Sequence, residues 1–141
     1  MDQESIVYGC IKDVVDGQDN MQRLEINRKA MLSLPSIEDW PLVSREMFSL
    51  PSYQDGHKTY QTEVIHFGAS YKAVEYEWSQ WIEQFEALLS RMYWVSATVH
   101  LETEISGTHT FTWYAKGSCH EPGSNAMNVK CEWSHEGALQ I

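Results

Sequence analysis

Residues 73–92 read AVEYEWSQWIEQFEALLSRM, and this stretch decides the fold. Apolar side chains recur along it at steps of three, four and one, which is the period of an amphipathic α-helix. We therefore predict one long helix over residues 73–92, with its apolar stripe packed against a sheet. The exposed side of this helix carries the acidic residues Glu75, Glu77, Glu83 and Glu86.

The residues on both sides of this helix predict strands. Apolar and polar residues alternate along 93–102 and along 108–115, and Ser106-Gly107 supplies the turn of a hairpin. Further strands are predicted at 5–11, at 60–67 where Gly68 ends the strand, and at 127–133. A shorter helix runs from about residue 20 to Leu34, where Pro35 ends it.

The order of these elements predicts an α+β fold. An antiparallel sheet of about four to five strands, with two main helices packed on one face, is the economical arrangement. The second face of the sheet would then be partly open. A length of 141 residues fits a single globular domain over residues 1–141.

Charge excludes several function classes. Ten Lys and Arg against 20 Asp and Glu give a net charge of −10, which argues against nucleic-acid binding. No apolar run approaches the length of a membrane span, and the first ten residues carry acids where a signal peptide carries bases.

Three cysteines without a CxxC pair predict reduced thiols in a cytoplasmic protein, with a Cys119–Cys131 disulfide as the alternative.

A metal site is the first chemical candidate. Zinc-ligand residue types gather near the end of the chain, at Cys119, His120, Cys131 and His135. The adjacent Cys119 and His120 do not readily point at one ion, and zinc modules usually bring their first ligands as CxxC. We therefore expect no metal and no cofactor.

Catalysis by side chains alone is the second candidate. Cys10 shares a strand face with Ile6 and Tyr8, which predicts a small core residue rather than a nucleophile. His100, Glu102 and Glu104 share another strand face and are the residue types of a general base or a metal site. Outward strand positions are polar by default, however, so we expect a solvated face and no enzyme.

Acidic residues interleaved with aromatics predict a protein-binding surface. Tyr and Trp are typical anchors of protein interfaces, and opposite charge accelerates the encounter with a basic partner. Two sets of partner-binding residues are predicted as alternatives. The first lies on the helix, at Glu75, Tyr76, Glu77, Glu83 and Glu86, and the second on the open sheet face, at Trp94, His100, Glu102 and Tyr114.

Residues 62–104, TEVIHFGASYKAVEYEWSQWIEQFEALLSRMYWVSATVHLETE, resemble the small acidic immunity proteins of bacterial polymorphic-toxin and contact-dependent-inhibition systems. The resemblance lies in size, acidity, the α+β layout and a helix rich in Trp and Glu. It implies a cytoplasmic protein that binds the toxic domain of a cognate effector and blocks its active site. The acidic residues add the expectation of a basic toxin, such as a nuclease, whose phosphate-binding surface they would occupy.

Two other classes stay open at this point. The first is a small enzyme or ligand-binding domain with a pocket beside the sheet. The second is a chaperone or adaptor that binds a secreted effector without suppressing its toxicity. The pattern of residues sets no oligomeric state.

Overall fold

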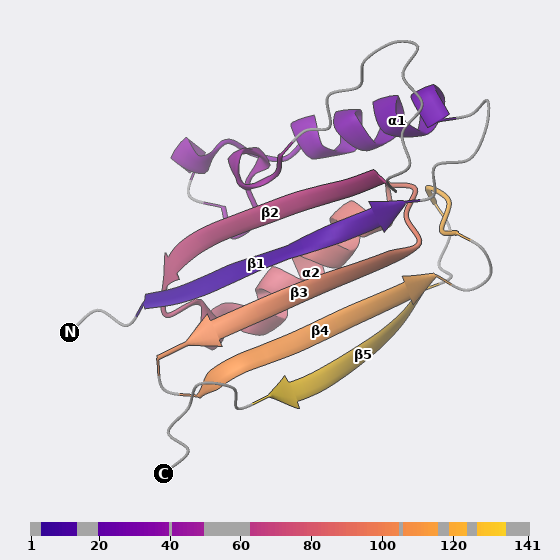
Figure 1. Ribbon diagram of the computed structural model, residues 1–141. Coiled ribbons are helices and arrows are strands. Elements are labelled where there is room, and N and C mark those ends of the chain that lie inside the picture. The colour runs from indigo at the N-terminus through magenta and orange to yellow at the C-terminus, as the bar shows by residue number, and fades with distance from the viewer. Residues whose placement is uncertain are drawn as a thin grey trace.

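Five strands form one antiparallel sheet (Figure 1). The computed structural model describes residues 4–13, 20–39, 41–49, 63–104, 106–115, 119–123 and 127–134, with only the backbone of residues 20, 21, 63 and 127–134. The strands are β1 (Glu4–Asp13), β2 (Glu63–Lys72), β3 (Ser96–Thr103), β4 (Gly107–Ala115) and β5 (Met127–Ser134). They lie in the order β2-β1-β3-β4-β5, and the predicted α+β class is confirmed.

The helices pack on one face of this sheet. The two α-helices are α1 (Asn20–Leu32) and α2 (Trp78–Leu89), and the short 3₁₀ turns are η2 (Ile37–Asp39), η3 (Arg45–Met47) and η4 (Val74–Glu77). In Figure 1, α2 crosses behind the sheet and α1 lies along the side of β2. Buried side chains of both helices and of the inward strand positions belong to a single core cluster. None of the helices within the described ranges reaches the length and apolarity of a membrane span.

Phe85 joins α2 to the sheet. Its ring lies 5.1 Å from the ring of Trp81, 5.3 Å from Phe67 on β2 and 5.1 Å from Trp113 on β4. Phe85, Trp81 and Trp113 have no exposed surface. Aromatic pairs of this kind contribute about 0.5–1.5 kcal/mol each beyond the area they bury. The aromatic stripe of α2 therefore determines which face of the sheet becomes the core.

Polar contacts attach α1 to the rest of the fold. The buried Asn27 amide donates to the Tyr93 carbonyl oxygen at 2.9 Å and accepts from the Tyr93 N–H at 2.7 Å. Arg23 forms an ion pair with Asp13, the last residue of β1, and its guanidinium lies 4.7 Å from the Tyr93 ring centroid. Burial alone would lower the pKa of Arg23, but the hydrogen bond and the charge of Asp13, together with a smaller contribution from Cys119, outweigh it and raise that pKa.

The predicted helix over 73–92 is shorter than expected. Ala73 adopts a left-handed conformation (φ 52°), residues 74–77 form the 3₁₀ turn η4, and α2 begins at Trp78 and ends at Leu89. The Val74 N–H donates to the buried Ser5 hydroxyl at 3.0 Å. This contact ties the chain to β1 where it leaves β2, and the tight turn replaces the first helical turn.

Two strand predictions were also wrong in detail. Gly68 does not end β2, because the strand stays paired with β1 as far as Lys72 opposite Glu4. Cys10 is not a core residue: Val7 and Ile11 are buried, and Ile6, Tyr8 and Cys10 face the other way. Both faces of β1 carry apolar residues, so alternation alone does not tell which one meets the helices.

Gly9 is required where β1 passes β3. A Cβ atom at Gly9 would lie 1.9 Å from the Thr98 carbonyl oxygen and 2.9 Å from the Phe67 ring. We expect Gly9→Ala to lower the free energy of unfolding by about 2–3 kcal/mol, because backbone of a central strand must move. The matched control is Gly68→Ala, whose nearest atoms would be at 3.6 Å. Urea denaturation measures both, and an unchanged midpoint for Gly9→Ala would contradict this packing.

Tyr71 makes stability sensitive to alkaline pH. Its hydroxyl donates to the Leu42 carbonyl oxygen at 2.5 Å and accepts from Trp81 Nε1 at 3.0 Å. Burial raises the pKa of Tyr71, and the Trp81 hydrogen bond only partly opposes this. An unfolded tyrosine ionises near pH 10, so this stabilisation is complete below about pH 10 and is lost as the pH rises through the higher folded-state pKa.

Tyr71→Phe tests this assignment. The substitution leaves the Leu42 carbonyl and the Trp81 N–H without their partner, so we expect a loss of about 1–3 kcal/mol at neutral pH. The loss should shrink above pH 10, where the wild-type contact weakens. Thermal unfolding from pH 7 to 11 measures it, with the exposed Tyr76→Phe as control. A difference that grows with pH would contradict the assignment.

Candidate functional site

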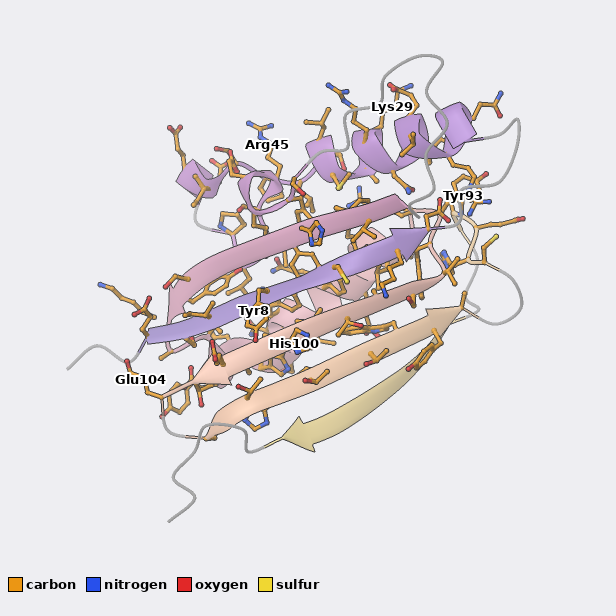
Figure 2. All side chains as sticks on the ribbon, viewed as in Figure 1. Tyr8, Lys29, Arg45, Tyr93, His100 and Glu104 are labelled. Carbon is orange, nitrogen blue, oxygen red and sulfur yellow. The ribbon has the colours of Figure 1, made fainter. Side chains whose placement is uncertain are left out.

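The second face of the sheet, here called the open face, is the candidate site. No helix or strand within the described ranges lies over it, and Figure 2 views it from the front. It consists of the strand positions that alternate with the buried ones. These are Ile6, Tyr8, Cys10 and Lys12 on β1, His66, Gly68 and Ser70 on β2, Thr98, His100 and Glu102 on β3, and Thr108, Thr110, Thr112 and Tyr114 on β4.

An aromatic pair occupies the middle of the open face. Tyr8 on β1 is directly opposite His100 on β3, and the two rings stack with centroids 4.9 Å apart (Figure 2). His100 Nδ1 lies 3.0 Å from Thr110 Oγ1 on β4. Tyr8 is 39% exposed. The stack and the hydrogen bond hold two planar rings across three strands, which is a preformed contact surface.

Two more large side chains are exposed on this face. Ile6 precedes Tyr8 on β1 and is 40% exposed, and Tyr114 near the end of β4 is 49% exposed. Apolar side chains grouped on one face mark interaction sites more often than single exposed ones do. Ile6 and Tyr8 are neighbours on this face, whereas Tyr114 lies toward its other end, opposite Ser96 in the β3–β4 register.

One end of the open face is acidic. A shallow depression of about 250 Å³ is lined by Glu4, Ile6, Glu102, Thr103 and Glu104. We call Glu4, Glu102 and Glu104 the acidic end. Glu4 accepts a hydrogen bond from the Ser70 hydroxyl at 2.6 Å, while Glu102 and Glu104 are exposed. Negative charge thus lies beside the exposed Ile6 side chain.

The structure places three predicted residues on the open face and one elsewhere. His100, Glu102 and Tyr114 lie there, as expected. Trp94 was expected beside them but has no exposed surface. It precedes β3 and forms an isolated bridge with His120; its Nε1 donates to the Leu89 carbonyl oxygen at 2.9 Å, and its ring stacks on His120. Trp94 is therefore a core residue.

The predicted helix residues lie on the far side of the sheet. Tyr76 (75% exposed) and Glu77 are exposed on η4, which leads into α2, and Glu83 is exposed on α2, which crosses behind the sheet in Figure 1. Glu86 was expected on this exposed side but is half-buried and accepts a hydrogen bond from Trp113 Nε1 at 2.9 Å. Glu75 is also half-buried. The two predicted sets therefore lie on opposite faces and do not form one interface.

The structure describes the side chains of two of the four metal-ligand candidates, Cys119 and His120. Within those ranges, no three His, Cys, Asp or Glu side chains are placed to hold one ion. His120 is buried with Nδ1 2.9 Å from the Met92 carbonyl oxygen, and Cys119 is a free thiol. The Cys131 side chain and His135 lie outside the described residues.

A second depression lies beside the sheet, between η3 and β2. It has a volume of about 340 Å³ and is broadly open to solvent. Its lining consists of Glu46, Met47, Phe48, Ser49, His66, Phe67 and Gly68. It occupies the place expected for a ligand pocket, but small-molecule sites enclose most of the ligand surface, and an open depression does not.

Comparison with known proteins adds no relative. No family model, no curated protein and no solved structure matches the chain. The function is therefore inferred from the surfaces of the chain itself.

Ile6 and Tyr8 are candidate site residues that the sequence did not single out. Their strand has apolar residues on both faces, whereas the helices of this fold cover only one. A strand that is apolar on both faces, in a sheet with helices on one side, is the pattern that points to them.

Substitutions of Trp94 and Tyr114 compare a buried with an exposed aromatic side chain. We expect Trp94→Ala to lower the free energy of unfolding by about 3–5 kcal/mol, as for other fully buried aromatics. Tyr114→Ala should change it by less than about 0.5 kcal/mol. Thermal and urea unfolding of the two variants compare them directly. Equal effects would mean that the exposed and buried assignments of these side chains are wrong.

Proposed function

We propose that the chain is an immunity protein that binds the toxic domain of a bacterial effector and blocks its active site, without catalysing a reaction. The observation that carries the proposal is the open face, where exposed aromatic and aliphatic side chains lie next to carboxylates on a rigid sheet. Interfaces combine aromatic anchors with a polar rim in this way. In this proposal the protein acts in the cytoplasm, where it meets the toxin.

The size of the open face suits a protein partner. The four strands β1 to β4 that define the open face are eight to ten residues long and cover a planar area of roughly 500 Å² at ordinary strand spacing. A specific interface buries about 800 Å² on each partner, so this face supplies most of such a contact. A flat surface of this kind suits a folded domain better than a small molecule, which binds in an enclosed pocket.

Charge supports a basic partner. The chain carries a net charge of −10, and the acidic end places carboxylates beside the exposed apolar side chains. Toxins that act on nucleic acid need Lys and Arg around the active site to hold phosphate. An acidic surface that covers such a site would neutralise it and would associate rapidly through electrostatic attraction.

The central experiment is coexpression with the product of the adjacent gene. We expect that product to be toxic alone and harmless with this chain, and the two to copurify. A harmless product, or toxicity that persists despite copurification, would contradict the immunity function. The second result would instead favour the chaperone or adaptor.

Substitution of Tyr8 tests which surface of the chain binds the toxin. We expect Tyr8→Ala to weaken binding of the toxin by roughly 30-fold, the cost of about 2 kcal/mol for an interfacial aromatic hot spot. The matched control is Tyr76→Ala, an exposed tyrosine on the far side of the sheet. Isothermal titration calorimetry measures both affinities. A large loss for Tyr76→Ala with none for Tyr8→Ala would move the interface to η4 and α2.

A further inference from the structure

The open face is asymmetric along its strands. Glu4, Glu102 and Glu104 lie at the end where β1 begins and β3 finishes, and Lys12 lies at the opposite end of β1. The exposed cations Lys29 and Arg45 project from α1 and η3, away from the acidic end (Figure 2), whereas the exposed Lys72 of β2 lies at that end, opposite Glu4. Three carboxylates and one ammonium leave this end negatively charged, while Lys12 is at the other end, and this difference favours one docking orientation of a basic partner.

The acidic end also carries two carboxylates that form no ion pair among the described residues. Glu4 has a hydrogen bond from Ser70, and Lys72 is opposite it in the β1–β2 register. The carboxylates of Glu102 and Glu104 form no ion pair with any residue that the structure describes. Both are exposed close to the Ile6 side chain, so a cation from outside the chain would meet carboxylates that pair with none of the described residues there.

The neighbouring side chains favour one kind of cation. Ile6 is opposite Glu102 in the β1–β3 register, lines the depression and is 40% exposed, and Tyr8 follows on the same strand face. A guanidinium is planar and weakly hydrated, pairs with carboxylates through two hydrogen bonds and packs on aliphatic and aromatic surfaces. An ammonium keeps its water more tightly and gains less from Ile6 and Tyr8.

We propose that the open face docks a basic protein in one orientation, with an arginine of the partner lying over Ile6 against Glu102 and Glu104. This inference rests on the proposed function and names the chemistry of the contact. The partner thus presents apolar side chains to Tyr8 and Tyr114 and an arginine to the acidic end.

The first test uses a short peptide as probe. The ¹⁵N- and ¹³C-methyl-labelled protein is titrated with acetyl-Gly-Arg-Gly-amide and observed by NMR. We expect shifts at the Ile6 methyl groups and at the Thr103 and Glu104 amides. The same peptide with citrulline, which has the shape of arginine without its charge, should give none, and the lysine peptide should give about threefold smaller shifts. Equal shifts with lysine, or shifts spread over α2, would overturn the arginine assignment.

The second test removes two charges with substitutions that keep the shape of the side chains. Glu102→Gln with Glu104→Gln removes both carboxylates and keeps the side-chain shapes. We expect loss of the peptide shifts and about tenfold to hundredfold weaker toxin binding, mostly through slower association. The matched control, Glu77→Gln with Glu83→Gln, makes the same charge change on the far side and should leave both readouts unchanged. Equal losses in the two variants would mean that net charge alone matters and would overturn the docked arginine.

The two proposals fail separately. If the Glu102 and Glu104 variant still binds the toxin as tightly as the unmodified chain, the arginine contact is wrong while protection by coexpression keeps the immunity function. If no toxin is bound at all, the immunity function is wrong, and the peptide titration still decides whether the acidic end selects a guanidinium.

Discussion

The packing of one aromatic stripe on one face of a sheet is the interaction on which the rest of this structure depends. Phe85 contacts rings from β2 and β4, and Trp81 stacks against it on the same side of α2. With α2 on one face, and α1 packed into the same core cluster, the inward strand positions become core. The outward positions of the same strands then form the open face, because a strand directs alternate side chains to opposite sides.

Rigidity of the open face follows from this core. Tyr8 and His100 belong to two of the three interior strands, β1 and β3, which pair with each other over eight residue pairs. The positions on either side of Tyr8 are Val7, which is fully buried, and Gly9, which passes close to the Thr98 backbone. A contact surface held in place by such strands loses little conformational entropy on binding, which raises affinity for a given contact area.

The strongest periodic patterns predicted the fold well. The helical period of residues 78–89 and the alternation along β3 and β4 anticipated the α+β class and the position of the hairpin. Predictions failed where the local pattern was ambiguous, or where a contact with a residue distant in the sequence determined the local structure. Residues 74–77 continue the helical period, but the left-handed Ala73 and the Ser5–Val74 hydrogen bond turn them into η4. Trp94 fits the strand alternation, yet its bridge with His120 buries it.

The candidate site was predicted only in part, for a related reason. His100, Glu102 and Tyr114 were expected on the open face because polar and apolar residues alternate along their strands. Ile6 and Tyr8 were missed, since only the packing of α2 decides which apolar face of β1 is buried. Glu86 was assigned to the exposed side of the helix, and its hydrogen bond to Trp113 is a long-range contact that no spacing rule contains.

The most direct test of the central claim is an NMR map of the labelled chain in complex with its toxin domain. The account predicts that the side-chain resonances of Ile6, Tyr8 and Tyr114 shift on binding, while those of Tyr76 on the far side of the sheet stay in place. Shifts confined to Tyr76 and the surrounding residues of η4 and α2, with Tyr8 unchanged, would contradict it.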